Sequence, residues 1–179
     1  MKKILITGAN GLLGQKLVYQ LKWMNNVQCI ATAKGDNRLL DKEGYEYVDA
    51  DVTDHQRIKE VIITSKPHYI IHTAAMTNVD ACETDHENCK KINIEAVQNL
   101  ANICNELNIH LIHISTDFIL DGESGPYDEN ATPNPLSYYG WSKWEAEKIV
   151  QQIKAPWTIV RTVLVYGMVD NMSRSNIVL

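Results

Sequence analysis

Positive charge, paired cysteines and long apolar runs are scarce in this chain. Among its 179 residues, 17 Lys and Arg stand against 22 Asp and Glu, which gives a net charge of −5. A protein surface that binds DNA or RNA usually carries a basic excess, so we expect no nucleic-acid partner. No apolar run approaches the roughly 20 residues of a membrane-spanning helix, so we expect no membrane partner either.

Cysteine spacing argues against the common cysteine-based sites. C-x-x-C pairs are typical of redox motifs and zinc ribbons, and none is formed by Cys29, Cys82, Cys89 and Cys104. We therefore expect free, mostly buried thiols and a cytoplasmic protein. His110 and His113 lie in an expected strand, where their spacing would point them to opposite faces, so no metal site is expected there.

Short apolar runs alternate with longer segments of helical period. The runs predict six strands, at 3–7, 27–32, 45–48, 69–73, 110–115 and 158–163. The helical segments are 12–24, 54–64, about 85–107 and 136–153. This alternation predicts an α/β, Rossmann-type doubly wound parallel sheet in the order 3-2-1-4-5-6 with right-handed crossovers. The segment 121–135, rich in Gly, Pro, Asp and Asn, is expected to be a surface loop.

Three glycines follow the first expected strand with the spacing G-x-x-G-x-x-G, at Gly8, Gly11 and Gly14. In this strand–turn–helix context one glycine allows a tight turn, one lets backbone approach a pyrophosphate, and one lets the helix pack closely on the strand. The helix N-terminus adds free N–H groups and a positive dipole end. The pattern predicts an NAD(P) cofactor, held by Gly8, Asn10, Gly11, Leu12, Leu13 and Gly14.

The tip of the second strand bears on which nicotinamide cofactor is preferred. NAD-binding proteins often carry an acidic residue about 20 positions after the turn, and Lys34 stands there instead. Lys34 and Arg38 would accept a 2′-phosphate, so we favour NADP over NAD. Two alternatives stay open: Asp36 turning inward to a ribose, or both cations belonging to a solvated loop. Asp51 and Val52, after the third strand, are placed to meet an adenine ring.

A Y-x-x-x-K pair, Tyr139 and Lys143, lies near the start of an expected helix. Residues four apart share one helix face, so phenol and ammonium would lie side by side, and a neighbouring cation lowers a tyrosine pKa. Thr116 ends the fifth expected strand at its carboxyl end, where open α/β sheets bind ligands. Together these residues indicate a catalytic site.

With these motifs, the chain resembles an extended short-chain dehydrogenase/reductase. Within that superfamily it resembles the dTDP-4-dehydrorhamnose reductase branch. The resemblance covers essentially the whole chain and is carried by the glycine turn, Asp51-Val52, His72-Thr73-Ala74-Ala75, Asn93, the segment 115–122, Pro126-Tyr127, the segment 133–135 and the Tyr139/Lys143 pair.

The resemblance implies roles for the site residues. Tyr139 would protonate a carbonyl oxygen as hydride leaves the nicotinamide. Lys143 would bind the nicotinamide ribose and lower the pKa of that tyrosine. Thr116 would hydrogen-bond the same oxygen, and Asn93 would support the site. Thr73, Ala74 and Ala75 would line the cofactor site, and Thr77, Val79 and Phe118 a pocket for a nucleotide-linked 4-keto sugar.

The chain departs from the family pattern in two side chains and in length. Phe118 stands where the family usually has tyrosine, and Leu164 where it often has tryptophan, so the sugar is left open. Family members run to about 300 residues. We therefore expect residues 1–179 to be one NAD(P)-binding Rossmann domain, the N-terminal part of a longer protein without its substrate domain. Alone it would bind cofactor with little turnover. Dimerisation through the segments that correspond to 85–107 and 136–153 is common among such relatives, so the resemblance implies a homodimer as one expectation.

Two other functions compete with a sugar reductase. One is an epimerase or dehydratase of the same superfamily; a 4,6-dehydratase would carry glutamate at position 118, where this chain has Phe118. The other is a non-catalytic, cofactor-binding regulatory protein, since the chain also resembles the regulatory subunit of methionine adenosyltransferase. The intact Tyr139/Lys143 pair argues against the regulatory alternative.

Overall fold

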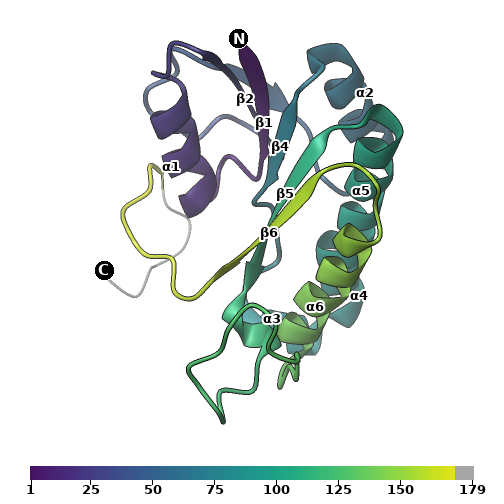
Figure 1. Cartoon of the computed structure of the whole chain (residues 1–179). Helices are drawn as coiled ribbons and strands as arrows, with labels where there is room; N and C mark the ends of the chain where they lie inside the picture. The colour runs from purple at the N-terminus through teal and green to yellow at the C-terminus, as the bar shows by residue number, and fades with distance from the viewer. Residues whose placement is uncertain (172–179) are drawn as a thin grey trace.

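A six-stranded parallel sheet forms the centre of the molecule (Figure 1). The structure is a computed structural model and describes residues 1–171. All strand pairs are parallel and their order is β3-β2-β1-β4-β5-β6, as the sequence predicts. The strands are β1 (Lys2–Thr7), β2 (Val27–Ala33), β3 (Glu46–Asp49), β4 (Tyr69–His72), β5 (His110–Thr116) and β6 (Trp157–Thr162).

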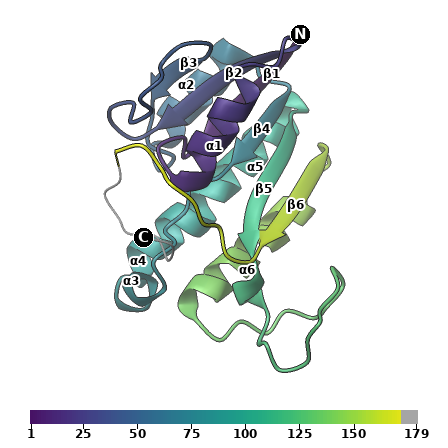
Figure 2. The same ribbon diagram turned by 90° about the vertical axis from the view of Figure 1, so that its left-hand side faces the viewer.

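Helices cover both faces of this sheet, and each face has its own core. Helix α1 (Leu12–Leu21) lies on one face, while α2 (His55–Ser65), α5 (Ala96–Leu107) and α6 (Tyr138–Gln151) lie on the other (Figures 1 and 2). One core joins the sheet to α2, α5 and α6 through residues such as Ile70 and Leu100. The other joins it to α1 through Ile6 and Val18. Burial on both sides explains why the central strands β1, β2 and β4 are mainly apolar.

The expected helix from about residue 85 differs most from the sequence prediction. A short helix that the sequence did not predict, α3 (Val79–Thr84), precedes it and begins where the Asn78 side chain accepts from Ala81 N at 2.8 Å. Asp85 then caps α4 (His86–Lys90) by accepting from Asn88 N at 3.0 Å. A π-helical turn, η1 (Lys91–Glu95), connects α4 to α5. The chain therefore bends here because two side-chain caps begin two helices.

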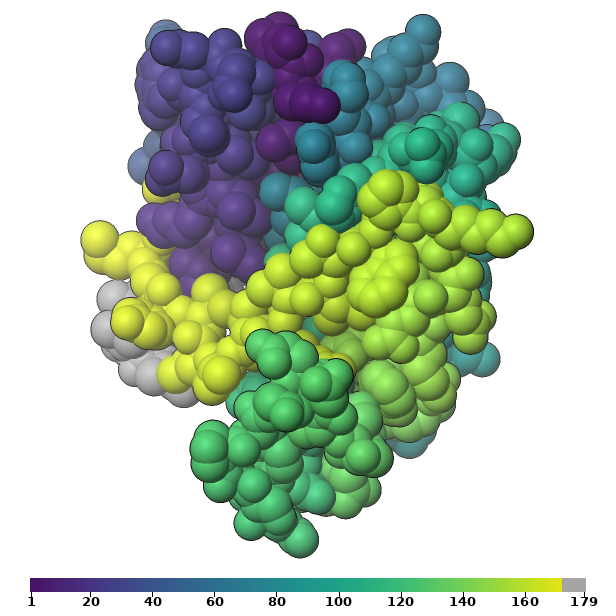
Figure 3. Space-filling model, viewed as in Figure 1, coloured from purple at the N-terminus to yellow at the C-terminus, as the bar shows by residue number. Residues whose placement is uncertain are grey.

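The remaining differences are at element ends and in the connections. Helix α1 ends at Leu21 rather than at residue 24, because Lys22 begins a turn that leads to β2. The segment 121–135 is a loop, as predicted, and follows the short 3-10 turn η2 (Asp117–Ile119); it projects from the lower end of the molecule in Figure 3. A helix expected from about Met172 lies outside the described residues. Within residues 1–171, no helix is long and apolar enough to cross a membrane.

Candidate functional site

The glycine turn joins β1 to α1 and has no space for side chains at two of its positions. Gly8 has φ +69°, and a Cβ there would lie 2.6 Å from the backbone nitrogen of Ala74. A Cβ on Gly14 would lie 2.3 Å from the carbonyl oxygen of Gly8. The first glycine thus lets the turn touch the end of β4, and the third lets α1 pack against the turn, as the motif predicts.

The N-terminus of α1 presents free backbone donors at the same turn. Gly11 is the N-cap, and among the described residues no side chain caps this end and no acidic residue lies in its first turn. Four N–H groups of a helix lack partners within the helix, and the dipole makes this end positive. Uncapped donors beside a glycine-rich turn form an environment that fits a phosphate.

A groove of about 380 Å³ runs from this turn along the carboxyl ends of the strands. Most of its lining belongs to the predicted cofactor-binding set: Gly8, Gly11, Lys34, Asp51, Val52, Thr73, Ala74 and Ala75. Four further lining residues were missed, namely Thr53, Asn88, Lys91 and Ile92. The last three lie on α4 and η1, so only the contact between this helical segment and the strand ends brings them to the groove.

Lys34 and Asp51 form an ion pair at one end of the groove. Lys34 Nζ lies 2.9 Å from Asp51 Oδ2, although the lysine side chain is 81 % exposed. Asp51 Oδ1 also accepts from the backbone and the hydroxyl of Thr53, each at 2.9 Å. Partial burial would raise the pKa of Asp51, but the Thr53 hydrogen bonds and Lys34 hold it below its usual value. The carboxylate therefore stays charged and fixes the lysine at the tip of β2.

Asn10 connects the glycine turn to the loop after β2. Its side-chain nitrogen donates to the carbonyl of Asp36 at 2.9 Å, and its oxygen accepts from Arg38 N at 3.0 Å. Tyr47 of β3 donates to the carbonyl of Gly35 at 2.7 Å. Asn10 and Arg38 do not line the groove, and neither do Leu12, Leu13 and Gly14. The asparagine thus orders the loop that carries the basic residues.

Tyr139 and Thr116 lie together at the carboxyl end of β5. Tyr139 is 9 % exposed on the first turn of α6, and its phenol lies near the Thr116 hydroxyl. That hydroxyl donates to Asp117 Oδ1 at 3.1 Å and accepts from Phe118 N at 3.2 Å. Burial raises the pKa of Tyr139, and the Thr116 hydroxyl partly opposes this rise. The phenol is therefore protonated at neutral pH, as a general acid must be before it donates.

Lys143 lies one turn further along α6 and is buried. Its Nζ donates to the carbonyl of Ile114 at 2.7 Å and lies 3.3 Å from His113 Nε2. Burial lowers the pKa of Lys143 to about 8, against a rise from the charge of Glu147. Burial raises the pKa of Tyr139, and the Lys143 ammonium is directed toward β5, so the expected lowering of that pKa by Lys143 stays a prediction.

Asn93 supports the site from the π-helical turn. Its side chain accepts from Met76 N at 2.8 Å and donates to the Met76 carbonyl at 3.1 Å and to the Ser142 hydroxyl at 2.9 Å. These bonds connect the loop after β4 to α6 at Ser142, which lies between Tyr139 and Lys143 in the sequence. π turns are frequent at functional sites, and here the turn directs a buried amide inward.

The three residues assigned to a sugar pocket differ in their surroundings. Phe118 is 46 % exposed and packs edge-on against Tyr139, with ring centroids 5.7 Å apart. Val79 begins α3 and packs against the cluster of Cys82, Cys89 and Tyr139. Thr77 is exposed in the loop between β4 and α3. Phe118 and Val79 thus adjoin the candidate acid directly.

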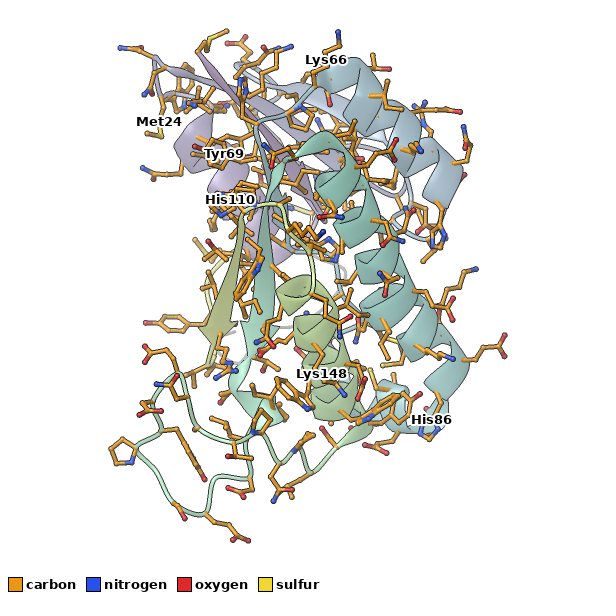
Figure 4. All side chains as sticks on the ribbon, turned by 45° about the vertical axis from the view of Figure 1, so that its right-hand side comes forward. Met24, Lys66, Tyr69, His86, His110 and Lys148 are labelled. Atoms are coloured by element: carbon orange, nitrogen blue, oxygen red, sulfur yellow. The ribbon has the colours of Figure 1, made fainter. Side chains whose placement is uncertain are left out.

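Two buried histidines next to Lys143, His72 and His113, were not recognised as site residues from the sequence. By contrast His110, at the amino end of β5, packs against Tyr69 with the ring planes tilted by 38°, far from His86 and the catalytic end (Figure 4). The four cysteines are buried and free, as predicted. Within residues 1–171, no group of His, Cys, Asp or Glu side chains is arranged to hold a metal ion.

Fold and site together define a Rossmann-like nucleotide-binding protein of the extended short-chain dehydrogenase/reductase type. The glycine turn, the groove at the strand ends and the Thr116–Tyr139–Lys143 arrangement are the features of that class. The chain belongs to the RmlD substrate binding domain family, whose model matches residues 1–178. This confirms the resemblance seen in the sequence.

Individual relatives include dTDP-4-dehydrorhamnose reductases and a subunit of methionine adenosyltransferase 2. The dTDP-4-dehydrorhamnose reductase of Bacillus anthracis in complex with NADP is 31 % identical, with a TM-score of 0.78 over 99 % of this chain and 58 % of that one. The dTDP-4-dehydrorhamnose reductase ortholog of Clostridium acetobutylicum is 33 % identical, with a TM-score of 0.78 over 98 % and 56 %. Methionine adenosyltransferase 2 subunit beta of Bos taurus is 33 % identical over 97 % of this chain and 50 % of that protein. The chain thus spans about half the length of such relatives.

Proposed function

We propose that this chain is the cofactor-binding part of an NAD(P)-dependent reductase that acts on a nucleotide-linked 4-keto sugar. The observation that carries the proposal is that the Tyr139 phenol and the Thr116 hydroxyl lie side by side at the carboxyl end of β5. A buried, protonated phenol beside a second hydroxyl can donate a proton to a carbonyl oxygen held between them. The dTDP-4-dehydrorhamnose reductases among its relatives support this reaction class.

Each site residue has a defined task in this proposal. The cofactor, when bound, supplies the hydride. Gly8 and Gly11, with the N-terminus of α1, would hold the pyrophosphate, and Lys143 would hold the nicotinamide ribose through its ammonium. Tyr139 would release its phenolic proton to the substrate oxygen, and Thr116 would keep that oxygen in line. Burial keeps water away from the phenol and the ammonium.

We also propose that NADP is preferred to NAD. Lys34 is exposed at the tip of β2 and is held by Asp51 beside the groove. A 2′-phosphate could bind the Lys34 ammonium there, either in place of the Asp51 carboxylate or together with it. Arg38 lies in the loop ordered by Asn10, four residues after Lys34, and would supply a second cation for the same phosphate. The NADP complex of the Bacillus anthracis relative supports the same preference.

The substrate is proposed to be held in part by protein beyond this domain. The chain, one Rossmann domain in our proposal, spans about half the length of its relatives, and Phe118 and Val79 beside Tyr139 would supply one side of a sugar pocket. Positioning can contribute roughly 7–11 kcal/mol to lowering a barrier. We therefore expect the chain alone to bind cofactor with little turnover, and its full-length parent to reduce dTDP-linked 4-keto sugars.

Reduction by the full-length parent tests the reaction. We would monitor NADPH oxidation as the loss of NADPH absorbance in the presence of dTDP-linked 4-keto sugars, for the parent and for its Tyr139→Phe variant. We expect turnover to fall about a hundredfold or more in the variant, with cofactor affinity nearly unchanged. An unaffected Tyr139→Phe parent would exclude Tyr139 as the acid.

A regulatory, non-catalytic role is the second candidate. It is favoured by the 33 % identity to methionine adenosyltransferase 2 subunit beta. In that case the parent would bind NADP but would not turn over any keto sugar. Another methionine adenosyltransferase subunit would co-elute with it in size-exclusion chromatography. Turnover with the sugar panel and no such complex would exclude this candidate.

A further inference from the structure

A row of polar side chains crosses the sheet beneath α6, inside an otherwise apolar core. Thr7, His72 and His113 are register partners on β1, β4 and β5, so their side chains share one face of the sheet. All three are buried. That face is covered by α5 and α6, since Leu5, Ile70 and Leu111, two residues before each of them, pack in the core with those helices.

Hydrogen bonds and ring contacts connect this row to Lys143. Thr7 Oγ1 lies 2.7 Å from His72 Nδ1, and the two imidazole rings stack with centroids 5.6 Å apart. His113 Nε2 then lies 3.3 Å from Lys143 Nζ. Within the described residues, His72 Nε2 and His113 Nδ1 have no hydrogen-bond partner. Burial of two imidazoles with unpaired nitrogens is unfavourable, which favours a reason other than packing for their presence.

Charge decides what the second imidazole does. Burial, and then the charge of Lys143, lower the pKa of His113 well below its usual value and that of His72 to about 3. Lys143, with a pKa of about 8, therefore keeps the proton at neutral pH. A neutral imidazole facing an ammonium can only accept, so His113 Nε2 takes one of the three N–H groups of Lys143.

We propose that His113 is a positioning residue for Lys143. The carbonyl of Ile114 and the imidazole of His113 accept two of the ammonium's N–H groups and fix a side chain that is otherwise long and mobile. One N–H is left for a ligand. By accepting from the charged form, His113 also keeps the buried lysine protonated when a ribose hydroxyl must be bound. The functional meaning of this role rests on the proposed function; the geometry does not.

Other ionisable groups face Lys143 and must be separated from this effect. Glu147, one turn further on α6, raises the pKa of Lys143, and so does Cys89 of α4. Glu147 is held by Arg161 of β6 through two hydrogen bonds of 3.1 and 2.8 Å. Tyr139 lies one turn before Lys143, and His72 lies behind His113. None of these groups is changed when His113 is substituted.

The first test measures the tautomer in the unaltered chain. In ¹⁵N NMR at pH 6.5, His113 should be neutral with its proton on Nδ1, because Nε2 accepts from Lys143. A charged His113 or a proton on Nε2 would overturn the proposal, and this measurement needs no variant to fold.

The second test follows Lys143 itself by ¹³Cε lysine NMR as the pH is raised, with Lys143→Met used for assignment. His113→Phe keeps the ring volume but removes the acceptor, and should lower the pKa of Lys143 by about one pH unit. His113→Gln restores an acceptor and should return most of that loss. His72→Phe removes an equally buried imidazole that does not accept from the lysine, and should change the pKa of Lys143 much less. Equal values for His113→Phe and the unaltered chain would overturn the proposal.

The third test asks whether the role reaches the cofactor site. NADPH affinity should weaken as pH rises through the pKa of Lys143, and His113→Phe should move that midpoint down by the same amount. If NADPH binds no form of the chain, the proposed function fails while the two NMR results still decide the role of His113. If NADPH binds with an unmoved midpoint, positioning by His113 is overturned.

Discussion

Substituting Gly8 by alanine should destabilise the fold through one specific backbone contact. The residue has φ +69°, and its new Cβ would lie 2.6 Å and 2.7 Å from the nitrogen and Cα of Ala74. Both atoms belong to the backbone at the end of β4, so they can move only if the turn moves away from the sheet. A left-handed conformation costs about 1–2 kcal/mol for an L-residue. Forcing a methyl group into packed structure costs about 1–3 kcal/mol more.

Gly122 offers a matched control for the conformational part of this effect. It has φ +80°, and in the part of the chain that the structure describes nothing lies within 4 Å of the position that a Cβ would take there. Gly122→Ala should therefore lose only the conformational part, about 1–2 kcal/mol. The reduced entropy of the unfolded chain is the same for both substitutions and cancels.

Urea denaturation of the two variants measures the difference. Gly8→Ala should be less stable than Gly122→Ala by about 1–3 kcal/mol at unchanged slope. Equal midpoints for the two variants would refute the reasoning, because they would show that the contact with Ala74 can relax without loss.

Two further predictions concern buried charge. The pKa of Lys143 is about 8 in the fold against an ordinary value of 10.5, so between these pH values the unfolded chain binds more protons than the folded chain. The free energy of unfolding, measured relative to Lys143→Met, should therefore rise with pH by roughly 3 kcal/mol in total. A difference between the two chains that does not change with pH in urea melts would contradict the lowered pKa. Arg161→Met leaves Glu147, whose side chain is 0 % exposed, without its bidentate partner, and should cost about 3 kcal/mol. Lys59→Met removes the exposed pair with Glu106 and should cost less than about 1 kcal/mol in the same melts, so similar losses would count against the burial argument.

The sheet and the glycine turn could be predicted from the sequence because both depend on local patterns. Alternating apolar runs and helical segments give the element order, and the right-handed crossover rule then limits the strand order. The glycine spacing gives the turn, and the structure places Gly8 against Ala74 as expected of a close approach. The helix α3 was missed because its six residues carry no apolar period and depend on the Asn78 cap.

The surroundings of Lys143 depend on contacts distant in sequence and could not be predicted. The spacing of Tyr139 and Lys143 places them on one face of α6, but it does not say that the ammonium reaches back to Ile114 and His113. That depends on which face of β5 packs against α6. The lining residues Asn88 and Lys91 were missed for the same reason, since α4 and η1 reach the groove only through tertiary packing.

Calorimetric titration of this chain with NADPH and NADH tests the central claim, a dinucleotide site at the glycine turn, most directly. We expect saturable one-site binding, tighter for NADPH. Gly11→Val should abolish it, because the added side chain would crowd the pyrophosphate. The variant should still fold, because Gly11 has φ −83° and ψ 168°, which valine adopts easily, and within the described residues its Cβ would meet only the Gly8 carbonyl, at 3.3 Å. No saturable binding of either cofactor, or undiminished binding to a folded Gly11→Val chain, would contradict the account.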